Sequence, residues 1–158
     1  MCGFVGFILS SNKGRDIVNN INKMTQSIEH RGPDDKGVWI DKNLGVALGH
    51  RRLSIMDTSI LASQPMESNS KRYVIVYNGE IYNFKELRKS LIKCGVIFKS
   101  QSDTEVLLSA IDNWGIERCL KAIVGMFAFA LWDKKEKILT LSRDRMGEKP
   151  LYYGFQDG

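Results

Sequence analysis

The sequence predicts an α+β fold with mainly antiparallel sheets. Short apolar segments follow one another as hairpins, and three or four amphipathic segments of helical period are grouped between them rather than alternating with single strands. The glycine-rich phosphate loops G-x-x-x-x-G-K and G-x-G-x-x-G do not occur. With 158 residues, of which 43% are hydrophobic and 26% charged, the chain has the size and composition of one globular domain.

The first part of the chain predicts a strand, a helix and a hairpin. Residues 4–9 are nearly all apolar and read as a buried strand. Asp16 can cap a helix whose apolar stripe is Ile17, Ile21, Met24 and Ile28. Two short strands are expected at residues 37–40 and 44–48, joined by a turn at 41–43.

The middle of the chain predicts a strand at residues 73–77 that ends in Asn78-Gly79. A helix follows, with Asn83 and Glu86 in the spacing of a capping box and Gly95 as its stop. A short strand is expected at 96–99. Ser102 or Asp103 then caps a second helix, which Gly115 ends, and a shorter helix is expected at 117–123.

The last part predicts a hairpin of strands 126–133 and 137–144, and a further strand at 151–155. The closing Asp157-Gly158 pair is a hairpin signal with no strand after it. We therefore expect the chain to be a fragment of a longer protein, or a domain whose sheet is completed elsewhere.

Charge and cysteine content disfavour several classes of protein. The net charge of +5 comes from lysines and arginines spread along the chain among acidic residues, whereas nucleic-acid binders gather them on one face. The apolar runs are too short to span a bilayer, and no basic segment of a secretory signal precedes them. Three cysteines without a C-x-x-C pair predict reduced thiols in the cytosol, and two histidines make a structural zinc site improbable.

Cys2 directly follows the initiator methionine. After removal of Met1, one residue would carry both a thiol and a free α-amino group. The amine ordinarily titrates near about 7.7–8.0 and the thiol near about 8.5, so the amine can take the thiol proton near neutral pH. The alternative is that Cys2 only begins a buried strand, as a small hydrophobic residue.

Four further positions carry groups that amide chemistry needs. Asn78 and Gly79 offer a side-chain amide and an unhindered backbone N–H, the two donor types that stabilise an oxyanion. Arg52 can clamp a carboxylate, while Glu80 and Asp103 can hold an ammonium group, which together match the head of an amino acid. From the residues alone, Asn78-Gly79 can equally be a plain turn, Arg52 a surface ion pair and Asp103 a helix cap.

Seven ordered motifs carry a family resemblance that covers essentially the whole chain. The set resembles the glutaminase domain of class II glutamine amidotransferases, most closely that of glutamine-hydrolysing asparagine synthetases of the B type. The motifs are Met-Cys-Gly-Phe-Val-Gly at 1–6, His-Arg-Gly-Pro-Asp at 30–34, His-Arg-Arg-Leu-Ser-Ile at 50–55, Asn-Gly-Glu-Ile-Tyr-Asn at 78–83, Ser-Asp-Thr-Glu at 102–105, Gly-Met-Phe-Ala-Phe-Ala at 125–130 and Arg-Asp-Arg-Met-Gly-Glu-Lys-Pro-Leu-Tyr-Tyr at 143–153.

The resemblance implies an N-terminal-nucleophile hydrolase fold, an α-β-β-α sandwich of two antiparallel sheets. It implies that Cys2 is the nucleophile, with its own α-amino group as the base, and that the Asn78 side chain and the Gly79 N–H form the oxyanion hole. The substrate-binding residues it implies are Arg52 at the α-carboxylate, Glu80 and Asp103 near the α-amino group, Asn78 and Gly79 at the amide, and pocket lining around Leu53, Ile55 and Met56. No catalytic role is assigned to His30 or His50.

The resemblance further implies that residues 1–158 hydrolyse L-glutamine to glutamate and ammonia through a γ-glutamyl thioester. The ammonia would pass to a C-terminal synthetase domain of the ATP-pyrophosphatase type, with aspartate as the leading acceptor. The sequence lacks that domain's Ser-Gly-Gly-x-Asp loop, so ATP and magnesium are expected only there and no cofactor or metal in this part. The expected location is cytoplasmic, with no nucleic-acid or membrane partner, and a homodimer stays open.

Two other functions compete with this reading. A non-catalytic interaction or regulatory domain of the same fold is disfavoured by the presence of Cys2, Arg52, Asn78, Gly79 and Asp103 together. A basic nucleic-acid-binding module has only the net charge in its favour.

Overall fold

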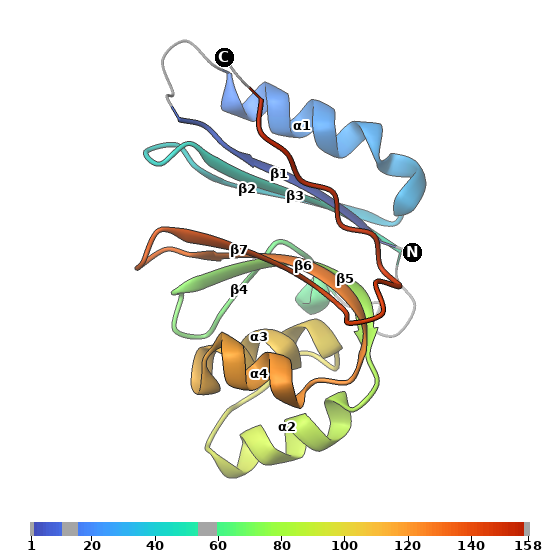
Figure 1. Ribbon diagram of the computed structural model, residues 1–158, viewed down its shortest axis with the longest axis vertical. Helices are drawn as coiled ribbons and strands as arrows, with labels where there is room; N and C mark the ends of the chain where they lie inside the picture. The colour runs from blue at the N-terminus through green and yellow to red at the C-terminus, as the bar shows by residue number, and fades with distance from the viewer. Residues whose placement is uncertain (1, 11–15, 54–59, 157–158) are drawn as a thin grey trace.

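Two antiparallel sheets lie face to face, with helices on the outer side of each, in a computed structural model that describes residues 2–10, 16–53 and 60–156 (Figure 1). This is the α-β-β-α sandwich that the family resemblance implied. No helix in these ranges is long and apolar enough to cross a membrane.

The smaller sheet has three strands in the order β1-β3-β2, formed by Gly3–Ile8, Val46–Arg52 and Asp35–Asp41. Helix α1 (Ile17–Ser27) covers its outer face and leads into the short 3₁₀ helix Glu29–Arg31. The Asp16 carboxylate accepts a hydrogen bond from the Asn19 N–H, which confirms the expected cap. The apolar stripe of α1 packs on the strands, where its residues Ile17 and Ile21 are buried with Ala47.

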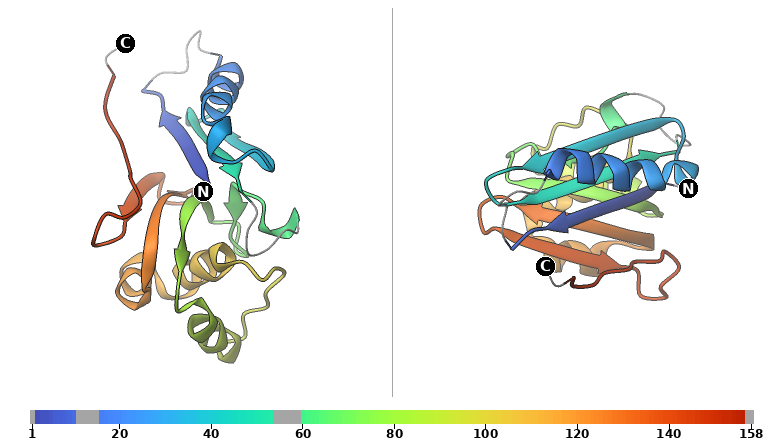
Figure 2. Two further views of the ribbon diagram at one scale, coloured as in Figure 1. Left: turned by 90° about the vertical axis from the view of Figure 1, so that its right-hand side faces the viewer. Right: turned by 90° about the horizontal axis from the view of Figure 1, so that it is seen from above.

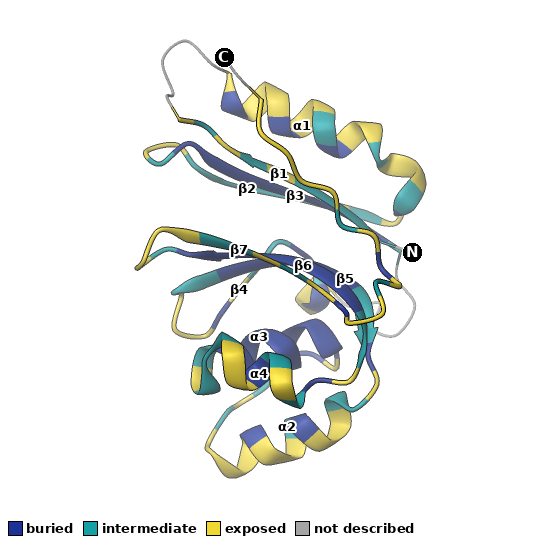
Figure 3. Cartoon of the chain, viewed as in Figure 1, coloured by how far each residue is buried: buried dark blue, intermediate teal, exposed yellow. Residues whose placement is uncertain are grey.

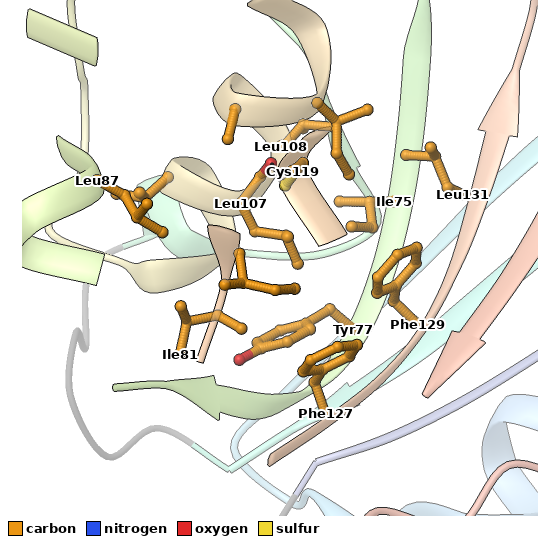
Figure 4. Close-up of a cluster of buried hydrophobic side chains, with 14 of the residues drawn as sticks. Ile75, Tyr77, Ile81, Leu87, Leu107, Leu108, Cys119, Phe127, Phe129 and Leu131 are labelled. Carbon is orange, nitrogen blue, oxygen red and sulfur yellow. Dashed lines mark hydrogen bonds between the residues drawn. The ribbon is translucent and has the colours of Figure 1, made fainter. Parts of the chain in front are cut away.

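The larger sheet has four strands in the order β4-β5-β6-β7, formed by Met66–Glu67, Tyr73–Ile81, Gly125–Asp133 and Ile138–Arg143. Helices α2 (Phe84–Lys93), α3 (Asp103–Trp114) and α4 (Ile116–Ala122) cover its outer face, and a 3₁₀ turn, Ile60–Ala62, precedes β4. The largest hydrophobic cluster lies between these helices and the sheet (Figure 4). Buried segments, coloured dark blue in Figure 3, concentrate in α3 and in the inner strands β3, β5 and β6.

Strand alternation divides the side chains between the layers. Successive residues of a strand point to opposite faces, so Val46 and Leu48 of β3 meet Val74 and Val76 of β5 between the sheets. Ile75 and Tyr77, which alternate with these two valines along β5, pack on the helices instead. The same alternation of side chains determines which polar residues face one another further along these strands.

Two predicted strands are wrong. Residues 96–98 are irregular, and the backbone N–H groups of Lys99 and Ser100 donate to the Glu105 carboxylate instead of to a strand. Residues 151–155 also have no regular structure; they run past the β1 edge of the smaller sheet without joining it (Figure 2). Leu151 is partly buried, whereas Tyr152 and Tyr153 are exposed and Phe155 is fully exposed.

Two local expectations around Asn78 are also wrong. The strand expected at 73–77 does not end before Asn78 and Gly79. Both residues continue β5, because β6 runs alongside and pairs them with Ala128 and Phe127, and this excludes the alternative of a plain turn. A glycine is required there, since a β-carbon at position 79 would lie 2.3 Å from the Met126 carbonyl oxygen. The capping box at α2 does not form either: the Asn83 amide instead bonds the backbone of residues 122 and 124.

Candidate active site

One pocket, with a volume of about 200 Å³, lies where β3 and β5 end beside each other. This volume is below the range of about 300–1,000 Å³ typical of drug-sized ligands, so the pocket suits a molecule the size of an amino acid. It is lined by seven of the predicted site residues: Cys2, Arg52, Leu53, Asn78, Gly79, Glu80 and Asp103. Ile55, Met56 and Met1 lie outside the described residues.

Cys2 reaches the pocket because it precedes the first paired residue of β1. Gly3 pairs with Arg51, so the antiparallel register carries Cys2 alongside Arg52 and Leu53. The Cys2 sulfur is 3.4 Å from the Leu53 backbone N–H donor and 3.7 Å from the Leu53 carbonyl oxygen. The half-buried thiol is therefore held against the end of β3, with its residue lining the pocket.

Arg52 is the last residue of β3 and faces the space between the sheets. It follows Val46, Leu48 and His50 at intervals of two, and it is only 7% exposed. The expectation that residues 49–52 come after a strand is thus corrected, since β3 runs to Arg52.

The His-Arg-Gly-Pro-Asp segment supports this end of β3. A β-carbon on Gly32 would lie 2.5 Å from backbone atoms of Arg51 and Arg52, so only glycine allows this approach. The Asp34 N–H then donates to the Arg52 carbonyl oxygen at 3.0 Å. The motif therefore positions the backbone of Arg52, while His30 is exposed and does not line the pocket.

Asn78 and Glu80 project from β5 toward the smaller sheet. They continue the alternation of Val74 and Val76, whose side chains fill the layer between the sheets, so their side chains share that layer with Arg52. Gly79 lies between them and exposes its backbone to the pocket. An amide, a backbone N–H, a carboxylate and a guanidinium are thus gathered around one thiol.

Asp103 begins α3, and Ser102 rather than Asp103 is the N-cap, accepting from the Glu105 N–H. One oxygen of the Asp103 carboxylate accepts hydrogen bonds from the Tyr77 hydroxyl at 2.7 Å and from the Ile81 N–H at 2.9 Å. Burial raises the pKa of Asp103 above its ordinary value, although these donors oppose the rise. Burial and the nearby Asp103 carboxylate raise the pKa of Tyr77 well above its usual range, so the phenol stays a donor.

His50 lies between the sheets and is 1% exposed. Its Nε2 is 3.1 Å from the Tyr77 carbonyl oxygen, which can only accept, so Nε2 carries the proton. Burial lowers the pKa of His50 to about 4, the Tyr77 carbonyl opposing the shift. His50 is therefore a neutral structural donor between the sheets, and it does not line the pocket.

Several pocket residues were not predicted: Ala62, Gln64, Tyr77, Ser102, Thr104, Met126 and Lys149. Lys149 is 4% exposed, and the sequence marked its segment only as part of a motif.

The turn that carries Lys149 is held by Asp144, whose carboxylate accepts hydrogen bonds from the N–H groups of Phe127, Glu148 and Lys149. Burial alone would raise the pKa of Asp144, but these donors hold it below its ordinary value. No local signal marks such residues, because long-range packing buries them.

Within the described residues, no three histidine, cysteine, aspartate or glutamate side chains gather in a way that could hold a metal ion. The groups that line the pocket suit a particular chemistry. A thiol beside amide and backbone donors suits attack on a carbonyl carbon, and the guanidinium and carboxylates suit a zwitterionic substrate.

Comparison with known proteins gives consistent results. The profile of a family described as the glutamine amidotransferase domain matches residues 1–158. The chain is 41% identical over 175 residues to the putative glutamine-hydrolysing asparagine synthetase 2 of Methanocaldococcus jannaschii, covering 100% of this chain and 32% of that protein. It is 41% identical over 155 residues to the glutamine-hydrolysing asparagine synthetase 3 of Bacillus subtilis, covering 97% of this chain and 25% of that protein. The chain thus spans about a third to a quarter of the length of these relatives.

A solved structure shares the fold. The glutamine phosphoribosylpyrophosphate amidotransferase of Bacillus subtilis, complexed with ADP and GMP, superposes with a TM-score of 0.71 over 91% of this chain and 37% of that chain, at 22% identity. At this identity the likeness bears on the fold alone, and it agrees with the sandwich of two antiparallel sheets described above.

Proposed function

The chain belongs to the glutamine amidotransferase domain family, and from this premise we propose that it hydrolyses L-glutamine through a thioester on Cys2. The observation that carries the proposal is the convergence of Cys2, Arg52, Asn78, Gly79 and Glu80 on one pocket. These residues come from three separate segments of the chain, yet they supply a nucleophile, two oxyanion donors and charges of both signs.

The first half of the reaction forms the thioester. Once Met1 is removed, the α-amino group of Cys2 accepts the thiol proton, and the thiolate attacks the side-chain amide carbon of glutamine. The Asn78 side-chain amide and the Gly79 N–H donate to the developing oxyanion. The protonated α-amino group then gives its proton to the leaving nitrogen, the C–N bond breaks, and ammonia leaves.

The second half regenerates the thiol. The free α-amino group accepts a proton from a water molecule, whose oxygen attacks the thioester carbon. The same two donors stabilise the second oxyanion. The C–S bond breaks, the sulfur takes the proton back, and glutamate leaves.

Substrate binding is assigned to charges around the pocket. Arg52 would hold the α-carboxylate of glutamine in a bidentate contact, and Glu80 would face the α-amino group. Asp103 contributes to the same end of the pocket, although one of its oxygens already accepts from Tyr77 and Ile81. Leu53 lines the wall, and Ile55 and Met56 are assigned there by the resemblance alone.

The chain would act as a class II glutaminase domain within a longer cytoplasmic protein. Relatives named as asparagine synthetases are three to four times as long, which supports a C-terminal synthetase domain as the recipient of ammonia. Aspartate is the proposed acceptor, on the strength of those names. ATP and magnesium would bind to that domain and would take no part in glutamine hydrolysis in this pocket.

The test is glutamate release by the chain with Met1 removed, a state that an intact-mass measurement verifies. We expect Cys2→Ala to abolish release, because no other cysteine lines the pocket in the described part of the chain. Cys94→Ala, which alters an exposed cysteine, is the matched control and should keep wild-type activity. Equal release by Cys2→Ala and the wild type would disprove the nucleophile assignment, and no release by the processed wild type would favour a non-catalytic domain.

A further inference from the structure

The edge of β5 that lies away from β6 changes its hydrogen-bond partners halfway along the strand. Strand β4 pairs only with its first part, through Glu67 opposite Val74 and Met66 opposite Ile75. Beyond that point side chains take over, since the Tyr77 N–H donates to Gln64 Oε1 at 2.7 Å and the Ile81 N–H to Asp103 Oδ2 at 2.9 Å. His50 Nε2 donates to the Tyr77 carbonyl oxygen.

Gly79 lies midway between the two capped N–H groups. Backbone N–H groups of a strand alternate between its two edges. Those of residues 77, 79 and 81 therefore share the edge that pairs with β4 only at residues 74 and 75. Gly79 also lines the pocket. The N–H proposed to bind the oxyanion is thus flanked by two backbone N–H groups that side chains hold.

Gln64 is itself held from three directions. Its Nε2 donates to the Thr104 hydroxyl oxygen at 3.3 Å, and its backbone fits so closely against β2 that a β-carbon on Gly37 would lie 2.0 Å from the Gln64 carbonyl oxygen. The side chain is buried, with only 6% of the residue exposed. Because the Tyr77 N–H can only donate, the amide oxygen of Gln64 must be the atom that faces it.

We propose that Gln64 is a positioning residue, whose amide oxygen fixes the Tyr77 peptide and thereby aims the neighbouring Gly79 N–H at the oxyanion. The inference rests on the proposed function. Both ends of the Gln64 amide bond to the protein, so its role differs from that of Asp103, which is also assigned to the substrate. Without the Gln64 oxygen, the buried Tyr77 N–H would lose its acceptor, and the strand would be free to twist at Gly79, its most permissive residue.

The experiment compares Gln64→Met with the wild type, because methionine keeps the length of the side chain and removes the strong acceptor. A donor misplaced by about 1 Å can lower a rate by about 10²-fold, so we expect kcat for glutamine to fall about 10- to 100-fold while KM changes less than about threefold. The rate of Cys2 alkylation by iodoacetamide should stay within about twofold, because that displacement forms no oxyanion.

A rescue variant and a control complete the design. Gln64→Glu restores an acceptor for the Tyr77 N–H, and the Thr104 hydroxyl can turn to donate to the carboxylate, so most of kcat should return. The control, Gln156→Met, makes the same change at an exposed glutamine outside the pocket and should leave kcat and KM at wild-type values. Hydrogen exchange at the Tyr77 amide should accelerate in Gln64→Met and not in Gln156→Met.

The outcomes separate this inference from the function on which it rests. An unchanged kcat in Gln64→Met, or a raised KM alone, would overturn the positioning role, as would an alkylation rate that falls in parallel with kcat. Unaltered hydrogen exchange at the Tyr77 amide in Gln64→Met would overturn the claim that Gln64 fixes this peptide, whether or not the wild type is active. Failure of the processed wild type to release glutamate would disprove the proposed function and would leave the exchange result to decide whether Gln64 fixes the peptide.

Discussion

The two halves of β5 show how one strand can serve both stability and chemistry. Its first half lies between β4 and β6, and its side chains alternate between the layer shared with the smaller sheet and the helical core. Its second half keeps β6 on one edge, but on the other edge β4 is replaced by side chains from β3, from α3 and from the loop before β4.

This difference shows where a fold can present a backbone N–H donor to a substrate. A strand inside a sheet uses every N–H in its ladder, so none remains for a ligand. Capping by discrete side chains occupies only selected positions and leaves Gly79 facing the pocket. Substitutions in the first half should therefore change stability, and those in the second half should change activity.

The largest expected effect comes from Asn78→Ala in the second half. Loss of one oxyanion donor typically lowers kcat by about 10²–10³-fold, and we expect that range for glutamine hydrolysis. The backbone pairing of residue 78 with Ala128 persists, so the free energy of unfolding should change little. Steady-state kinetics combined with urea denaturation measures both quantities.

Arg52→Ala is the comparison within the same pocket, because it should raise KM for glutamine more than it lowers kcat. If Asn78→Ala instead destabilised the chain and left kcat of the folded protein intact, the two halves of β5 would not differ as described.

The second prediction concerns the first half of β5, where we expect a substitution to lower stability and leave kcat unchanged. Ile75→Ala removes methyl groups from a side chain that is fully buried in the helical core, and such truncations reduce the free energy of unfolding by about 2–5 kcal/mol. The kcat of the molecules that remain folded should match the wild type, since Ile75 does not line the pocket. Ile75→Val serves as the graded control, with an expected loss of about 0.5–1.5 kcal/mol. A drop in kcat without a loss of stability would contradict the division.

The smallest effect concerns pH and the His50 donor at the boundary of the two halves. The pKa of His50 is about 4 in the folded chain and 6.5 in the unfolded reference, so below pH 6.5 the unfolded chain binds more protons. This contribution to stability is present above pH 6.5 and is lost as the pH falls toward 4, with about 2 kcal/mol lost between pH 7 and pH 5.

Denaturation at the two pH values measures this loss, and His50→Gln is the control because its amide N–H can still donate to the Tyr77 carbonyl while it does not titrate. The variant should lose about 2 kcal/mol less than the wild type over this range. Equal losses in both proteins would show that His50 does not link stability to pH.

Much of the fold was predictable because short-range patterns carry it. The Asp16 cap, the hairpin around residues 41–45, the α3 cap and the β6–β7 hairpin each follow from residues within a few positions of one another. The strand expected at 151–155 failed because an apolar pattern forms a strand only where a partner strand runs beside it. The strand expected to end at residue 77 runs on through Asn78 and Gly79 for the opposite reason, since β6 supplies such a partner.

The chemical groups of the proposed site were predictable from the sequence alone, because their order along the chain is that of a known family: the thiol of Cys2, the proposed donors at 78 and 79, and the arginine at 52. Only the tertiary structure decided how their backbone is held. The side chains that cap the edge of β5 bond to residues 13, 22 and 27 positions away. A local pattern cannot report such contacts, because they exist only after the two sheets and α3 have packed together.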